Sequence, residues 1–372
     1  MAVLQQNNLN LDIFNTLYYF LLMADYKSLG THNFKDKGPM IVAELSANHG
    51  GTLQSALLNV ELAAKAGAHC FKLQTYKPET LTVDCNLPEY VVNDKNGLWA
   101  GETLYSLYTK AMTPWEWHKP IFEKCRELNI IPFSSPFDDT AVDLLEGLDV
   151  QFYKIASFES CDFTLLKKVA ETKKPVIIST GTSYLHEISE SINFLRKNGV
   201  EKIFILKCVS SYPALHQSFN LNTLPHLKKI LNCDIGISDH TQGLASPLAG
   251  IALGAKIIEK HIDFNEEKSL DSAFSIGELA LKTLCIEAKN AYLALGRHEF
   301  TPSKDDIENR KFRSSLIVTE DIKKGDLFTS KNLKARRPGN GLPIKHVWDI
   351  WNKKTAIIDI PKGTPLKFEF LG

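Results

Sequence analysis

Short apolar runs alternate with longer amphipathic segments through most of the chain. Eight such runs occur, at 40–46, 70–76, 130–135, 151–157, 175–180, 203–208, 234–238 and 256–261. Nearly continuous apolar character over this length is typical of strands that are buried on both faces of a parallel sheet. The segments between them, such as 113–128 and 183–197, are long enough to form crossover helices. Eight alternating strands and helices over roughly 250 residues predict a (β/α)₈ TIM barrel.

An open, doubly wound sheet is an alternative fold that the same alternation of strands and helices could form. Such a sheet usually has fewer strands and carries a Gly-rich GxGxxG turn after the first one. The sequence has no such turn after residues 40–46. The closed barrel is therefore the predicted fold.

The alternating pattern begins and ends inside the chain, which predicts four parts. Residues 1–38 form an N-terminal extension, and 39–297 form the barrel domain. Residues 298–312 are polar and read as a linker, and 313–372 form a small β-rich domain with turn sequences KKGD and PKGT. The apolar patch at 13–24 is too short to span a bilayer, and it lacks the flanks of a signal peptide. No membrane association is expected from it.

The longest gap between predicted strands is residues 77–129. We expect one helix and an irregular polar stretch, VVNDKNGLWAGETL, there. Long excursions at the C-terminal ends of strands often form lids or substrate walls. This segment is therefore a candidate wall of a binding site.

Composition removes several classes of function. Lys and Arg together number 43, as do Asp and Glu, so the formal net charge is zero and no nucleic-acid or membrane-surface partner is indicated. The seven cysteines are scattered, odd in number and without a CxxC pair. This pattern favours reduced thiols in a cytoplasmic protein over disulfides or a zinc knuckle.

All eight predicted strands end in polar side chains, and the C-terminal ends of barrel strands are where such folds carry their chemistry. The first ends in AELSANHGG (43–51), which is more polar than a turn requires. Lys72 and Lys154 stand inside apolar strands, where a lysine needs an anionic partner. That partner is either a structural carboxylate or a ligand, and Ser135, Ser157, Ser179 and Ser238 supply hydroxyl donors at the neighbouring strand ends. Together these groups predict a phosphate or carboxylate cradle.

Two histidines end neighbouring strands. His240 and His261 follow the seventh and eighth predicted strands, which lie about 5 Å apart in a sheet. Two imidazoles so placed can share one metal ion, although a single histidine at a strand end is more often structural. We therefore predict a divalent metal site at these two residues.

Ten motifs in chain order resemble the sialic acid synthase family, and they are closest to its pseudaminic acid branch. They are AELSANH, FKLQTYKPETLT, LYSLYTKAMTPWEWH, FSSPFDDTAVDLLE, YKIASFES, ISTG, CVSSYP, GISDHT, IIEKH and DSAFS. In the C-terminal part, KARRPGNGL resembles the SAF, or antifreeze-like, domain that follows the barrel in this family. The resemblance covers residues from about 40 to 372.

The resemblance implies a reaction and a set of site residues. Phosphoenolpyruvate would condense with water and the open-chain aldehyde of 2,4-diacetamido-2,4,6-trideoxy-L-altrose to give pseudaminic acid and phosphate. Glu44, His240 and His261 match catalytic positions, and the two histidines match ligands of Mn²⁺, Co²⁺ or Mg²⁺. The matches to phosphoenolpyruvate contacts are Lys72, Ser135, Lys154, Ser157, Ser179, Ser210 and Ser238. The matches to sugar contacts are Gln74, Glu159, Tyr212, Asp271 and Arg337, the last reaching the partner's barrel in a domain-swapped homodimer.

Two departures from the family pattern leave the sugar open. Gly50 stands in NHGG where the family usually has NHNG, and SLD precedes the matched aspartate where GPD is common. An N-acetylneuraminate or legionaminate synthase would use the same chemistry on another sugar. A binding protein with an inactive barrel is a third possibility, but retention of Glu44, both lysines and both histidines argues against it.

Overall fold

The computed structural model describes residues 26–93, 99–265 and 267–372. The chain divides into two compact units, Met1–Gly296 and Arg297–Gly372. The predicted patch at 13–24 lies outside the described residues. Among the described helices, none combines the length and the apolar character needed to cross a membrane.

The first unit is built on a parallel eight-stranded sheet. Its strands are β3 (Met40–Glu44), β4 (Cys70–Thr75), β5 (Ile131–Pro136), β6 (Tyr153–Ile155), β7 (Val176–Ser179), β8 (Ile203–Cys208), β9 (Asp234–Asp239) and β10 (Ile257–His261). They are hydrogen-bonded in the order β5-β4-β3-β10-β9-β8-β7-β6. β5 and β6, at the two ends of this order, are also in contact. The arrangement is the TIM-like barrel that the sequence predicts.

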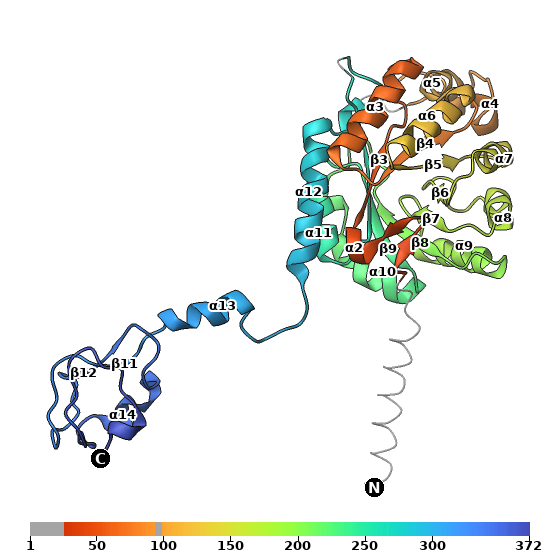
Figure 1. Cartoon of the computed structure of the whole chain (residues 1–372). Helices are drawn as coiled ribbons and strands as arrows, with labels where there is room; N and C mark the ends of the chain where they lie inside the picture. The colour runs from red at the N-terminus through yellow and green to blue at the C-terminus, as the bar shows by residue number, and fades with distance from the viewer. Residues whose placement is uncertain (1–25, 94–98, 266) are drawn as a thin grey trace, which may run out of the picture. The chain divides into compact units, whose positions relative to one another are not determined.

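Helices surround the strands (Figure 1). They are α3 (Leu53–Ala66), α6 (Trp115–Glu127), α7 (Asp139–Gly147), α8 (Phe163–Glu171), α9 (Leu185–Lys197), α10 (Leu224–Leu231), α11 (Ala245–Ala252) and α12 (Glu278–Leu295). Several begin at a side chain that accepts a hydrogen bond from a free backbone N–H of the first turn, as Thr52, Asp138 and Asp162 do for α3, α7 and α8. These caps fix where each crossover helix starts above its strand.

The connection between β4 and β5 contains more helix than the sequence predicts. Besides α6 it holds α4 (Pro78–Leu81), the 3₁₀ turn η1 (Pro88–Tyr90) and α5 (Leu104–Ala111). The expectation of a single helix was wrong because α4 is one turn and α5 has only eight residues, both too short for a clear helical period. The start of α4 is nevertheless marked by Pro78, a residue favoured at the first helical position.

Successive side chains along each strand point alternately to the surrounding helices and to the inside of the barrel. Ile41, Ala43 and Leu73 belong to the large apolar cluster that the strands share with the surrounding helices. Met40, Val42 and their counterparts on other strands form a second cluster inside the barrel. Because side chains of a strand alternate in direction, the next inward position after Val42 is Glu44. The interior of the barrel is thus apolar towards the N-terminal ends of the strands and polar at their C-terminal ends.

A short segment before β3 closes the lower end of the barrel. β1 (Ser28–Leu29) pairs with β2 (His32–Asn33), and α2 (Phe34–Lys37) follows directly. Leu29 and Phe34 join the inner apolar cluster with Phe152 and Phe204. Although residues 1–38 were predicted to be an extension, 26–38 are packed as the floor of the barrel.

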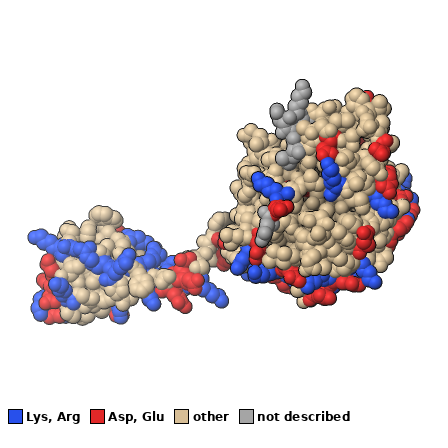
Figure 2. All heavy atoms as spheres, turned by 90° about the horizontal axis from the view of Figure 1, so that it is seen from above, with Lys and Arg blue, Asp and Glu red and all other residues tan. Residues whose placement is uncertain are grey.

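The second unit is small and rich in irregular structure. β11 (Ser315–Val318) and β12 (Leu333–Arg336) pair antiparallel, and α14 (Val347–Ile350) packs with them in a separate apolar core. α13 (Lys304–Asn309) lies within the segment predicted as a linker and starts at a capping box on Ser303. From Arg297 onward the sequence has 16 Lys and Arg against 10 Asp and Glu, and blue side chains spread over this unit in Figure 2.

Candidate active site

A cavity of about 480 Å³ opens at the C-terminal ends of the barrel strands. Most of the residues that the sequence singles out line it: Glu44, Lys72, Gln74, Lys154, Ser157, Glu159, Ser179, Ser210, Tyr212, Ser238, His240, His261 and Asp271. Two do not. Ser135 is buried on β5 next to Gln74 but outside the lining, and Arg337 belongs to the second unit.

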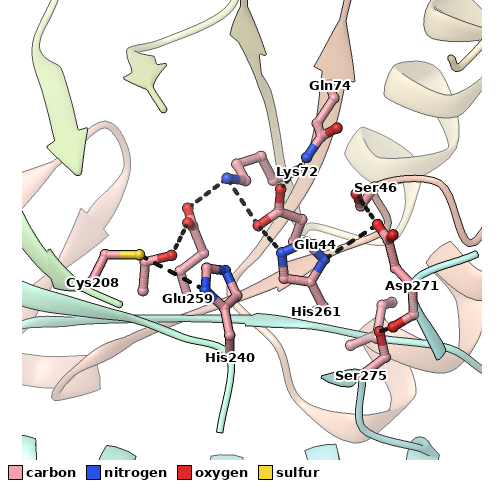
Figure 3. Close-up of polar contacts among 12 residues, drawn as sticks. Glu44, Ser46, Lys72, Gln74, Cys208, His240, Glu259, His261, Asp271 and Ser275 are labelled. Carbon is pink, nitrogen blue, oxygen red and sulfur yellow. Dashed lines mark hydrogen bonds and ion pairs between the residues drawn. The ribbon is translucent and has the colours of Figure 1, made fainter. Parts of the chain in front are cut away.

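The lysines and carboxylates at the bottom of the cavity form one network, of which Figure 3 shows Lys72, Glu44 and Glu259. Lys72 Nζ lies 3.0 Å from Glu44 Oε2 and 2.9 Å from Glu259 Oε2. Lys154 Nζ lies 3.3 Å from Glu259 Oε1, which also accepts a hydrogen bond of 2.9 Å from Ser238 Oγ. Both lysines therefore have protein partners, and the two cations are balanced by two carboxylates.

Glu259 is the main site residue that sequence reasoning did not assign. It lies two positions before His261 on β10, so it faces the same way as that histidine. Lys260, between them, points to the other side and pairs with Asp239 at 2.7 Å. The alternation of side-chain direction along a strand was the signal that could have identified Glu259.

The network shifts the pKa of each of its members. Burial alone would raise the pKa of Glu44, but His261, Lys72 and Lys154 hold it below its usual value. Burial would likewise raise the pKa of Glu259, and the two lysines lower it. For Lys72, the carboxylates outweigh burial and raise the pKa. For Lys154 burial dominates and lowers the pKa, so Lys154 is the less well compensated cation.

Several hydroxyls of the cavity region remain available to a ligand. The Oγ atoms of Ser179 and Ser135 are buried without a hydrogen-bond partner. Ser157 Oγ accepts a hydrogen bond from the Gly181 N–H at 3.1 Å, and its own proton faces Cys208. Buried polar groups are normally paired, so the unpaired hydroxyls indicate a polar ligand held beside the lysines.

The two predicted metal ligands lie next to each other. Their imidazole centroids are 5.1 Å apart. His240 Nδ1 lies 2.9 Å from the carbonyl oxygen of Val209, to which it donates, so Nε2 keeps its lone pair. His261 Nε2 is 3.3 Å from Glu44 Oε2, and its Nδ1 is buried without a hydrogen-bond partner, 3.8 Å from Asp271 Oδ2.

The fit of these residues to a metal ion is partial. Among the described residues, no group of three or more His, Cys, Asp or Glu side chains could hold an ion as arranged. Two imidazoles with free lone pairs, beside the carboxylates of Glu44 and Asp271, are a donor set that suits a first-row divalent ion completed by water or substrate oxygens.

The polar segment after β3 proves to be structural support for the site. Asn48 donates to the carbonyl oxygen of Ile262 at 2.8 Å, and its own oxygen accepts from the Asp271 N–H at 3.1 Å. Ser46 Oγ donates to Asp271 Oδ2 at 2.5 Å. Asp271 is nevertheless so buried that its pKa is raised to about 6. Asn48 therefore fixes the position of an acid that the sequence assigns to the sugar.

Two aromatic rings pack against the histidines. The Tyr212 ring lies 4.4 Å from His240 and 4.9 Å from Phe274, measured between centroids. Phe274 in turn lies 4.9 Å from His261. These rings exclude water from one side of the imidazole pair.

Comparison with known proteins gives the chain clear relatives. Residues 59–300 match the NeuB family, and residues 313–371 match the SAF domain. The chain is similar to a pseudaminic acid synthase of Campylobacter jejuni, at 39% identity over 89% of this chain and 96% of that protein. It is also similar, at 36% identity over 82% and 92%, to an N,N'-diacetyllegionaminic acid synthase of the same species. Among solved structures, an N-acetylneuraminic acid synthetase from Leptospira borgpetersenii in complex with citrate matches with a TM-score of 0.67 and 30% identity, over 77% of this chain and 95% of that one.

Proposed function

Because the chain belongs to the NeuB family, we propose that its cavity condenses phosphoenolpyruvate with an N-acylated amino sugar. The chain is a phosphoenolpyruvate-dependent nonulosonic acid synthase of the pseudaminic acid type. Its sugar substrate is 2,4-diacetamido-2,4,6-trideoxy-L-altrose in the aldehyde form. The greater identity to the pseudaminic acid synthase than to the legionaminic acid synthase favours this sugar.

The observation that carries the reaction class is the buried pair of lysines surrounded by free hydroxyls. Phosphoenolpyruvate has a phosphate and a carboxylate, and two cations with several donors are what such an anion requires. Lys72 and Lys154 would pair with it, and Ser157 and Ser179 would donate to its oxygens. Ser238, whose hydroxyl donates to Glu259 in the structure, would join them by turning towards the anion. Ser135 and Ser210 complete the proposed set from the adjoining strand ends.

Glu44 is placed to manage charge at the reacting carbons. In the reaction, the methylene carbon of phosphoenolpyruvate bonds to the aldehyde carbon, and the former enol carbon becomes positively charged. Water adds to that carbon, and the bond between it and the phosphate oxygen breaks. The Glu44 carboxylate, kept ionised by Lys72 and held by Gln74 at 3.0 Å, can stabilise the positive carbon and accept a proton from the water.

His240 and His261 are the proposed ligands of a divalent ion, Mn²⁺, Co²⁺ or Mg²⁺. When bound, such an ion polarises the aldehyde oxygen as a Lewis acid. We expect prolonged dialysis against EDTA to abolish turnover and added Mn²⁺ to restore it. Full turnover after metal removal confirmed by elemental analysis would contradict the metal site.

The sugar is proposed to contact Gln74, Glu159, Tyr212 and Asp271 from the chain's own barrel. Arg337 is proposed to reach the sugar in the barrel of a second copy, so the working enzyme is a homodimer. The seven cysteines are free where the structure places them, which supports the proposed cytoplasmic location.

The proposed function is tested by product formation. The purified full chain is incubated with phosphoenolpyruvate, Mn²⁺ and one sugar at a time: the diacetamido-trideoxy altrose, its legionaminate counterpart or N-acetylmannosamine. We expect phosphate release and a nine-carbon acid with the first sugar at the greatest kcat/KM. If phosphoenolpyruvate labelled with ¹⁸O in the bridging position is used, the label should appear in phosphate. Absence of phosphate release with every sugar would refute the proposal.

A further inference from the structure

The connection between β4 and β5 forms an apolar side of the cavity, to which Phe137, Phe158 and Phe274 add apolar lining from other loops. The connection between β4 and β5 contributes Leu81, Val92, Trp99, Leu104, Leu107 and Tyr108 to the lining. The polar groups of the site come instead from the strand ends and from residues 270–274. A ligand that fills the cavity must therefore present polar groups to one side and apolar groups to the other.

Trp99 has an unused hydrogen-bond donor on this apolar side. Its Nε1 atom is buried and has no partner in the structure. The backbone holds the residue in place: Glu102 N donates to the Trp99 carbonyl at 3.2 Å, and Val92 N donates to Glu102 at 2.9 Å. The indole reaches towards Tyr212, with centroids 6.4 Å apart. A buried N–H held in this way is expected to meet an acceptor supplied by a ligand.

An unused acceptor lies in the same cavity. Glu159 Oε2 is also buried without a hydrogen-bond partner, and Glu159 and Tyr108 both line the cavity. A free donor, a free acceptor and an apolar surface are together complementary to the acetamido group, which has a carbonyl oxygen, an N–H and a methyl. A sugar hydroxyl would match only the polar groups.

We propose that Trp99 and the apolar side formed by the β4–β5 connection determine which sugar is accepted. Trp99 Nε1 donates to the carbonyl oxygen of an acetamido group, while Leu104, Leu107 and their neighbours contact the acetamido methyl and the deoxygenated C6 methyl. Sugars with hydroxyls at C4 and C6 are disfavoured because those hydroxyls would lose water without gaining partners. This inference rests on the proposed function and names the residues that read the sugar.

The test compares three variants on two sugars. Trp99→Phe removes the N–H and keeps a ring. Leu104→Asn places a polar group at a half-buried position of the apolar side. Trp348→Phe, in the second unit and 71% exposed, is the control. For each, kcat/KM is measured with the diacetamido-trideoxy altrose and with N-acetylmannosamine, the KM for phosphoenolpyruvate is measured in parallel, and a urea unfolding curve confirms that the chain is folded.

We expect Trp99→Phe to lower kcat/KM for the diacetamido sugar about tenfold, as for loss of one hydrogen bond. Leu104→Asn should shift the ratio of the two sugars about tenfold towards N-acetylmannosamine, and the KM for phosphoenolpyruvate should stay within about twofold in both. If folded variants keep the wild-type ratio and rates, the inference is wrong while the wild-type result still supports the function. If wild type uses neither sugar, the function itself fails.

Discussion

Lys72 and Lys154 are both buried in one network, but their surroundings differ. Lys72 has two carboxylates within 3.0 Å, whereas Lys154 has one at 3.3 Å. Removing Lys72 would leave Glu44 and Glu259 facing each other without the cation between them. Removing Lys154 chiefly deprives an incoming anion of its partner. The two lysines should therefore give different mutational results.

Lys154→Ala is expected to weaken phosphoenolpyruvate binding, by on the order of 2–5 kcal/mol for a buried charge pair. The sugar KM should change much less. Steady-state kinetics with each substrate varied in turn gives both values, and Lys35→Ala, at an exposed lysine, is the control. An unchanged KM and kcat for phosphoenolpyruvate would show that Lys154 does not bind this substrate.

At the residue scale, the sequence does not say which of two adjacent polar residues in a strand faces the inside of the barrel. Lys72, Gln74 and Glu44 could be placed because each stands in a readable strand. Ser134 and Ser135 are adjacent at the end of β5, and only Ser135 shares the direction of Phe133 in the inner cluster. Contacts across strands, such as Glu259 with both lysines, depend on register, which the sequence does not state.

At the scale of elements, the floor of the barrel was the part that the sequence did not predict. β1 and β2 have two residues each, and no alternation can be read from two residues. The long strands and helices were predicted because their patterns run over five residues or more. The floor depends on tertiary packing of Leu29 and Phe34 against residues far along the chain.

The floor also makes the barrel sensitive to acid. His32 is buried with its ring 4.5 Å from that of His69. Burial lowers the pKa of His32 to about 4 and that of His69 to about 3. The His32 charge adds to the lowering at His69, and Lys37 and Lys289 have smaller effects on both. Both are neutral when folded, so their contribution to stability is complete above pH 6.5 and is lost as the pH falls below it. The loss by pH 5 is about 2 kcal/mol per histidine.

We expect His32→Gln and His69→Asn together to flatten the decline of the urea midpoint between pH 7 and pH 5. The glutamine amide can replace His32 Nε2 as donor to the Gly38 carbonyl, and the asparagine oxygen can replace His69 Nδ1 as acceptor of the Ile41 N–H. His186→Gln, at an exposed histidine, should leave the decline as in wild type. An equally steep decline in the double variant would exclude these two histidines as its cause.

At the scale of the whole molecule, zero net charge conceals two unequal parts. The excess of Lys and Arg from residue 297 onward leaves the first unit with an equal excess of Asp and Glu. The composition of the whole chain could not reveal this difference, because the two excesses cancel.

A mixed dimer tests whether Arg337 acts on the partner's barrel. A Glu44→Ala chain is combined with an Arg337→Ala chain, each of which should be nearly inactive as a homodimer. In the mixture, the barrel of the Arg337→Ala chain keeps Glu44 and receives Arg337 from the other copy. Purified heterodimer should recover about half of the wild-type activity if one site in two is complete. No recovery would mean that Arg337 serves its own barrel.

The closed floor has a consequence for the order of events during turnover. In the part of the chain that the structure describes, Leu29, Phe34, Phe152 and Phe204 fill the barrel below the lysines. Substrates and products must then pass through the mouth alone. Lys72 and Lys154 stand within strands, whereas Trp99 and Tyr212 lie in the loops that follow strand ends, so an anion bound at the lysines would lie deeper than the sugar. Phosphoenolpyruvate should enter before the sugar, and phosphate should depart after the nine-carbon acid. Phosphate would then inhibit competitively against phosphoenolpyruvate but not against the sugar, whereas random entry of the two substrates would remove that difference.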